Sequence, residues 1–136
     1  MTGKSTQTVW VTMAVLGHQV ITLLHGQAHT RLDVGLSSWQ NAYVLAVIVI
    51  APLIALVLSF TRFVSAGLWL LLASMLGSLI FGFCYHYVIN SLDHVAHLPA
   101  GGAQGLFRTT ALLLLLSETF GVAVAAIALR TSLKRS

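Results

Sequence analysis

Four segments of this sequence are each long and apolar enough to cross a membrane, and this property constrains the fold more than any other feature. A membrane-spanning helix needs about 20 mostly apolar residues, and the segments that qualify are residues 9–26, 41–60, 63–90 and 107–130. The composition agrees, because 57% of the residues are hydrophobic and 7% are charged, whereas a soluble domain is about one quarter charged. The sequence therefore predicts an all-α integral membrane protein with a single domain of four transmembrane helices.

The connections between the spans predict an up-down bundle. Only Thr61 and Arg62 separate the second span from the third, so these two helices should form a tight antiparallel hairpin. The longer loops, residues 27–40 and 91–106, then lie together on the opposite side. Pro52 lies inside the second span and should kink it, which a membrane helix tolerates when neighbouring groups satisfy the freed carbonyl.

The distribution of cations predicts the orientation. Lys and Arg accumulate on the cytoplasmic side of membrane proteins. The side that holds both termini carries more of them than the side that holds the long loops: Lys4, Arg62, Arg130, Lys134 and Arg135 against Arg31 and Arg108. We therefore expect an N-in/C-in protein of the inner membrane with extracytoplasmic long loops. Because the cations are scattered, no nucleic acid is expected as a partner; the expected partners are the lipid bilayer and further copies of the chain or other membrane subunits.

An alternative interpretation of the N-terminal segment is a signal peptide. Residues 1–28 begin with Lys4 and end in a small-x-small sequence, Gly26 to Ala28. The apolar stretch is long for a signal peptide and contains His18 and Gln19 in its middle, which favours a retained transmembrane helix.

At the outer ends of the spans, two local features can be predicted. Ser37 or Ser38 should cap the second helix. The aromatic side chains expected near the outer membrane interface, where such side chains are common, are those of Trp39, Tyr43, Tyr85, Tyr87 and Phe107.

Two ionisable residues are expected near the middle of the membrane. At about 1.5 Å of rise per residue, His18 of the first span and Glu118 of the fourth lie at similar depths. A carboxyl group at this depth should face the bundle interior and be paired or protonated. His18 and Glu118 are therefore predicted to form a buried polar pair or a proton relay.

Histidines outnumber carboxylates six to three in this chain, and five of the six are expected on the extracytoplasmic side. These five are His25, His29, His86, His94 and His97. The orientation prediction used only Lys and Arg, so the gathering of histidines on one side is an independent observation. It predicts a shared site at the outer rim of the bundle.

Helical spacing places several of these histidines on common faces. On the first helix, a polar stripe is formed by His18, Thr22, His25 and His29. On the third helix, a stripe of small residues ends in a histidine: Ser74, Ser78, Gly82 and His86. If the stripes face each other, His25, His29 and His86 converge, and the loop histidines His94 and His97 fold over them.

Imidazoles in this arrangement suit a transition metal, namely Cu, Zn or Fe. His25 and His86 from different helices are alternatively expected to hold a non-covalent b-type haem, since the sequence has no CxxCH motif. Asp33 and Asp93 are the acidic residues available to orient the imidazoles.

The sequence thus leads to three functional hypotheses and identifies no catalytic residues. The first is a metal- or haem-binding membrane protein for electron transfer or metal handling. The second is a small proton- or cation-linked transporter that uses His18 and Glu118. The third is an accessory subunit of a larger membrane complex.

Overall fold

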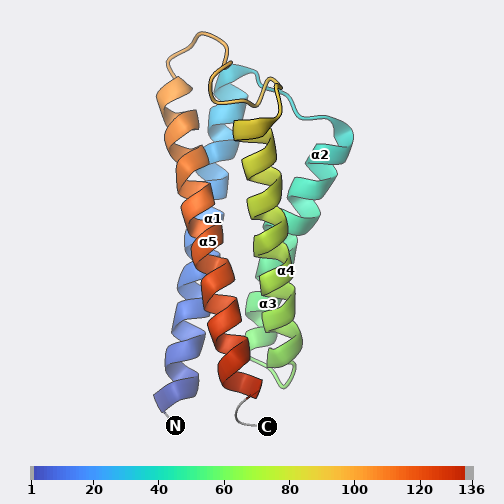
Figure 1. Cartoon of the computed structure of the whole chain (residues 1–136), viewed down its shortest axis with the longest axis vertical. Coiled ribbons are helices and arrows are strands. Elements are labelled where there is room, and N and C mark those ends of the chain that lie inside the picture. The colour runs from blue at the N-terminus through green and yellow to red at the C-terminus, as the bar shows by residue number, and fades with distance from the viewer. Residues whose placement is uncertain (1, 134–136) are drawn as a thin grey trace.

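The computed structural model describes residues 2–133, and all regular secondary structure in this range is helical. The elements are α1 (Thr2–Leu32), α2 (Ser38–Tyr43), the π-helix η1 (Val44–Ile50), α3 (Ala51–Ser59), α4 (Val64–Phe83), the π-helix η2 (Cys84–Val88) and α5 (Gln104–Leu133). Because α2, η1 and α3 follow one another without a break, as do α4 and η2, the chain forms four long helical rods (Figure 1).

Each rod contains a segment long and apolar enough to cross a membrane, which confirms the four predicted spans. The segments are Thr6–Leu32, Ser38–Ser59, Val64–Val88 and Gln104–Ser132. The first helix continues beyond its predicted end at Gly26, because Ala28 and Leu32 are buried in a hydrophobic cluster at that end. Lys134 and Arg135, which contribute to the orientation prediction, lie outside the described residues.

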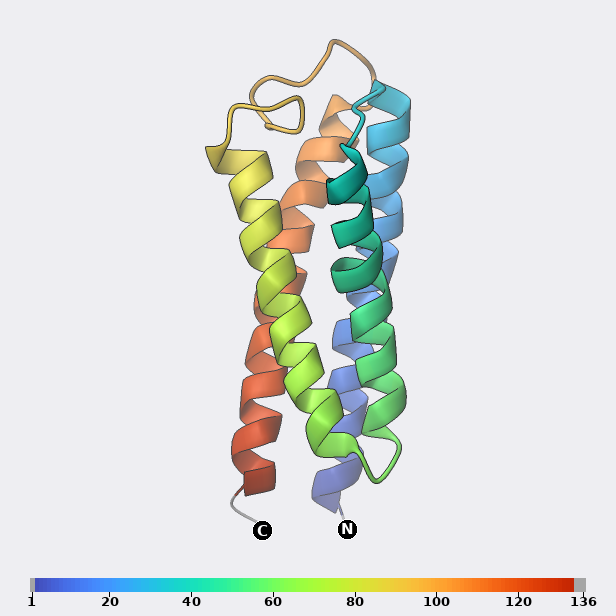
Figure 2. The ribbon, with the colours of Figure 1, turned by 90° about the vertical axis from the view of Figure 1, so that its right-hand side faces the viewer.

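The two chain ends lie at one end of the bundle, and the longer loops, residues 33–37 and 89–103, lie at the other (Figures 1 and 2). Around the bundle α1 packs against α5, α5 against α4, α4 against α3 and α3 against α1, so α1 and α4 face each other diagonally. We refer to the two ends as the terminal end and the loop end.

A separate hydrophobic cluster fills each end of the bundle. The cluster at the terminal end is made of Val11, Val15, Ala55, Leu68, Leu71, Met75, Ala125, Ala128 and Leu129. The cluster at the loop end is made of Ala28, Leu32, Val34, Leu98, Ala103, Phe107 and Ala111, and it anchors both long loops to the helices. Polar side chains are therefore held between two close-packed apolar regions.

The carbonyl that Pro52 leaves free is satisfied by a neighbouring helix, as predicted. Proline has no N–H to donate to the carbonyl four residues earlier, here that of Ile48, and the π-helix η1 ends two residues before the proline, at Ile50. Ile48 O instead accepts hydrogen bonds from Gln19 Nε2 at 3.1 Å and from His18 Nε2 at 3.3 Å. Two polar side chains of α1 thus satisfy the carbonyl that the proline leaves free.

The second rod begins with the predicted serine cap. Ser37 N donates to Gln40 Oε1 at 2.8 Å, and Gln40 N donates to Ser37 Oγ at 3.4 Å, which is a reciprocal capping box. Of the two serines considered, Ser37 is therefore the cap.

Candidate functional site

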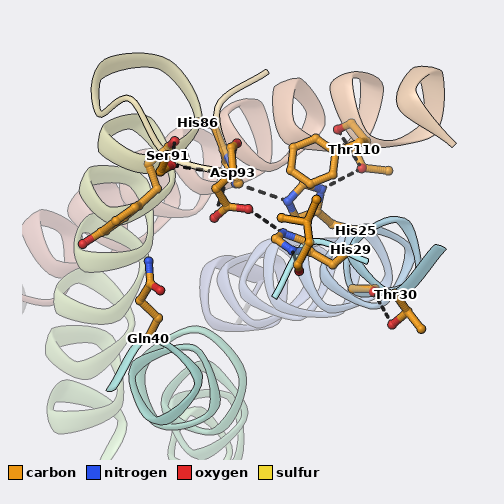
Figure 3. A network of polar contacts seen from close by, with 12 residues as sticks. His25, His29, Thr30, Gln40, His86, Ser91, Asp93 and Thr110 are labelled. Atoms are coloured by element: carbon orange, nitrogen blue, oxygen red, sulfur yellow. Dashed lines mark hydrogen bonds and ion pairs between the residues drawn. The ribbon is translucent and has the colours of Figure 1, made fainter. Parts of the chain in front are cut away.

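Three histidine side chains from two of the spans meet at the loop end of the bundle (Figure 3). The ring centroid of His25 lies 4.8 Å from that of His29 and 4.8 Å from that of His86, while His29 and His86 are 6.3 Å apart. His25 and His86 are 6% and 5% exposed. The predicted convergence of the two stripes is thus present, and we call these three residues the histidine cluster.

Phe107 packs against all three rings of the histidine cluster. Its ring centroid lies 4.6 Å from that of His25, 4.9 Å from that of His29 and 5.5 Å from that of His86. The sequence predicts Phe107 near the outer membrane interface; its side chain is fully buried inside the bundle at 0% exposure, so it faces the histidine cluster and not lipid. The reason is that α5 begins at Gln104 and turns this residue inward, into the cluster at the loop end.

The hydrogen bonds of His25 and His86 constrain which ring nitrogen carries the proton. His86 Nδ1–H donates to the backbone carbonyl of Asp93 at 3.0 Å, so the neutral ring presents an unprotonated Nε2. His25 Nδ1 lies 2.8 Å from the Thr110 hydroxyl oxygen, which is also 2.7 Å from Leu106 O. When this hydroxyl donates to Leu106 O, it accepts a bond from His25 Nδ1–H, and His25 then also presents an unprotonated Nε2.

The Nε2 atoms of these two rings point at each other. His25 Nε2 and His86 Nε2 are 3.2 Å apart, in the buried space between α1 and η2. Two lone pairs at this distance would repel each other, so the contact needs a proton or a metal ion between the two nitrogens. The tautomer of His25 that carries its proton on Nε2 supplies the proton, and a metal ion bound by both nitrogens satisfies them in the same way.

His29 shows the same pattern beside the pair. Its Nδ1–H donates to Val34 O at 3.0 Å, and its Nε2 lies 3.2 Å from Asp93 Oδ1. Asp93 is 4% exposed, and Oδ1 accepts no hydrogen bond in the described part of the chain. A lone pair and a carboxylate oxygen again face each other, and again a shared cation or proton satisfies both.

The turn at the end of α1 brings the Val34 carbonyl to His29. Asp33 has a φ of 53°, in the left-handed region, and Val34 N donates to His29 O at 3.0 Å, which closes the helix. The Asp33 side chain is exposed at the rim, so it shapes the turn while Asp93 contacts the imidazole.

His94 and His97 form a separate pair on the loop. Their rings stack on each other at a centroid distance of 4.7 Å, and His97 is exposed. The loop carrying them folds back onto the helices, because Val95 N donates to His86 O and Arg108 Nε donates to Val95 O, both at 3.0 Å. The loop therefore covers His86 mainly through Asp93 and Val95.

His18 and Glu118, predicted as a buried pair, are both buried but have different surroundings. His18 is 0% exposed and bonds to Ile48 O. Glu118 is 2% exposed, and its Oε2 has no hydrogen-bond partner among the described residues. The nearest link between them is a long contact of 3.4 Å from His18 Nδ1 to Ser117 Oγ, on the residue beside Glu118.

A cavity of about 520 Å³ adjoins the histidine cluster. Its walls include His25, His29, His86 and Asp93 at the loop end, and Glu118 lines its deeper part. In residues 2–133, no group of three or more His, Cys, Asp or Glu side chains is already arranged to hold a metal ion. The geometry in place is that of a two-nitrogen pair with a further imidazole and a carboxylate next to it.

Comparison of the chain with protein-family models, with curated proteins and with solved structures gave no match.

Proposed function

We propose that this protein binds a transition-metal ion in the membrane through Nε2 of His25 and Nε2 of His86. The observation that carries the proposal is the 3.2 Å separation of these two nitrogens, on rings whose Nδ1 atoms each lie within hydrogen-bond distance of an oxygen. Metal-binding histidines typically donate the other ring N–H to an oxygen, which fixes the ring and leaves the second nitrogen free for the metal.

The distance suits a single ion. With metal–nitrogen bonds of about 2.0–2.1 Å, nitrogens 3.2 Å apart would subtend an angle of about 100–105° at the metal, close to tetrahedral. A haem would require the two imidazoles on opposite faces of a macrocycle, so nitrogens in direct contact favour a metal ion over haem. Imidazole ligands suit Zn, Cu and Fe.

His29 and Asp93 are the residues best placed to complete the coordination. They contact each other at 3.2 Å, and the His29 ring lies 4.8 Å from that of His25. A metal ion at the nitrogen pair would attract either the imidazole or the carboxylate, so binding would require one of these side chains to turn from its present partner.

The proposed role is metal handling on the extracytoplasmic side of the membrane. The adjoining cavity gives an ion space in which to enter and leave, which favours exchange over a permanently held redox centre. The sidedness rests on the excess of Lys and Arg at the terminal end, which favours an up-down bundle with N-in/C-in orientation.

The direct test is metal analysis of the full-length protein purified in mild detergent. After loading with Zn²⁺ or Co²⁺ and removal of free metal, we expect a single bound equivalent by elemental analysis, visible d–d absorption for the Co²⁺ form and no Soret band. A Soret band would replace the metal proposal by haem, and absence of both metal and haem would refute it.

Replacing Thr110 with valine should weaken metal binding without touching a ligand. Valine has a similar shape but removes the acceptor for His25 Nδ1–H, and the proton is then better placed on Nε2, where it bonds to His86. The nitrogen pair is thereby satisfied without metal, and we expect affinity for Co²⁺ to fall about 10- to 100-fold. Thr110→Ser keeps the hydroxyl and should bind as the wild type does; equal affinities for the two variants would contradict this role.

A further inference from the structure

The cavity beside the histidine cluster collects all of the acidic residues of the chain. The sequence has three, and Asp33, Asp93 and Glu118 all line the cavity. None of the described Lys and Arg residues lines it. The chain has a formal net charge of +4, yet the walls of this cavity carry three carboxyl groups and three histidines and no Lys or Arg from the described part of the chain. This distribution of charge favours a cation as the occupant.

Glu118 lies in the part of this cavity that is farthest from the rim. Apolar residues of the second rod and of α5 itself, Ile48 and Leu114, also line the cavity. Across from the carboxylate is Gly82, where an added Cβ would stand 3.7 Å from Glu118 Oε2 and 3.8 Å from His86 Cδ2. The carboxylate and the histidine cluster therefore border the same space around Gly82.

One oxygen of the Glu118 carboxyl group has no hydrogen-bond partner among the described residues. Glu118 is 2% exposed, and the oxygen without a partner is Oε2. Burying an ionised carboxylate without a partner costs roughly several kcal/mol, even after the surrounding protein has relaxed. A buried carboxyl oxygen that lines a cavity and lacks a protein partner is satisfied either by a proton on the carboxyl group or by a cation in the cavity.

A second polar atom without a partner lies close to this level of the bundle. Ser78 is one helical turn before Gly82 on the same face of α4, is 0% exposed, and its Oγ has no hydrogen-bond partner among the described residues. Beyond Ser78 the bundle is closed, because Leu71 and Met75 are fully buried and an added Cβ on Gly121 would meet Met75 Cγ at 2.8 Å. The cavity thus ends near Glu118 instead of continuing to the terminal end.

We propose that Glu118 forms a second cation-binding site at the base of the cavity, selective for a hard divalent cation such as Mn²⁺ or Mg²⁺. Carboxylate oxygens and water are ligands that these ions prefer, and they retain several waters, for which the cavity has room. The site goes beyond the metal site proposed above, because its oxygen ligands select a different class of ion and it does not require the imidazoles. With the two sites, a single cavity would have nitrogen ligands at its rim and oxygen ligands at its base.

The test measures Mn²⁺ binding by electron paramagnetic resonance to full-length protein already saturated with Zn²⁺. We expect wild-type protein to bind Mn²⁺ in addition to Zn²⁺, and Glu118→Gln to bind Mn²⁺ at least about tenfold more weakly while its Zn²⁺ affinity stays unchanged. The matched control is Thr119→Val, on the neighbouring exposed residue of α5, which should bind both ions normally. Unchanged Mn²⁺ affinity in Glu118→Gln would overturn the proposal.

The two proposals fail separately in this experiment. Loss of Zn²⁺ but not Mn²⁺ binding in His25→Ala/His86→Ala supports both sites, whereas a wild type that binds Mn²⁺ through Glu118 and never binds Zn²⁺ refutes only the imidazole site. If Glu118→Gln does not fold, the wild type still decides the question. A membrane-permeant carbodiimide should label Glu118, as read by mass spectrometry, and Mn²⁺ should protect it; labelling that Mn²⁺ does not slow would overturn the proposal.

Discussion

Replacing His86 with alanine is expected to lower the affinity of the protein for Zn²⁺ or Co²⁺ by more than about 100-fold. Loss of a residue that only hydrogen-bonds a metal ligand typically lowers metal affinity by about 10- to 100-fold, and loss of the ligand itself should cost more. His86 Nε2 lies 3.2 Å from His25 Nε2, and the variant leaves one nitrogen where two are needed for the proposed ion. The measurement is competitive titration of the purified protein against a chromophoric chelator.

Two further variants distinguish a ligand from a merely structural histidine. His97→Ala removes an exposed imidazole from the same end of the bundle and should retain full affinity. The double variant His25→Ala/His86→Ala should lose little more than either single variant, because both nitrogens would serve one ion and their effects are not additive. Additive losses, or an equal loss in His97→Ala, would contradict the proposed pair.

Much of the fold could be predicted because membrane burial acts on local sequence. The four apolar segments, the short connection between the second and the third, and the capping serine at Ser37 are all local features. Each is found in the structure, where the connection covers residues 60–63. Pro52 shows the limit of such reasoning. Its freed carbonyl was expected to find a partner in a neighbouring helix, but only packing could show that the partners are His18 and Gln19.

The histidine cluster was predictable in outline because helical periodicity determines which side chains share a face. The stripe through His25 and His29 and the one ending in His86 meet as expected. The parts that sequence reasoning missed are Thr110 and Phe107. Thr110 lies two turns before Glu118 on one face of the fourth helix, which is a usable signal, but nothing local indicates that Phe107 points inward.

The hydrogen-bonding roles within the cluster could not be derived from sequence at all. They depend on backbone carbonyls of the two loops, those of Val34 and Asp93, whose positions follow from the tertiary structure. These carbonyls accept bonds from the Nδ1–H groups of His29 and His86, so the neutral form of each ring has an unprotonated Nε2. A motif such as HxxxH gives the spacing of the rings, whereas the loops determine which nitrogen is available for a metal.

Replacing Gly67 with alanine is expected to destabilise the protein by about 1–3 kcal/mol, the usual cost of forcing additional atoms into a packed interior. An added Cβ at Gly67 would lie 2.8 Å from Leu58 Cβ and 2.9 Å from Ala55 O. These atoms belong to the α3 side of the tight hairpin with α4, and neither is the flexible end of a long side chain. Relief therefore requires the two helix backbones to separate.

Gly17→Ala is the matched control, because an added Cβ there meets nothing within 4 Å. Alanine is favoured over glycine inside a helix by up to about 1 kcal/mol, so this variant should be as stable as the wild type or more stable. The measurement is reversible unfolding in mixed micelles followed by circular dichroism, with Co²⁺ affinity as a second readout. Gly67 lies at the terminal end, far along α4 from His86, so Gly67→Ala protein that remains folded should bind Co²⁺ normally. Equal stabilities for the two variants would mean that α3 and α4 do not approach as closely as Gly67 permits. The hairpin would then not fix the position of η2, which continues α4 and carries His86.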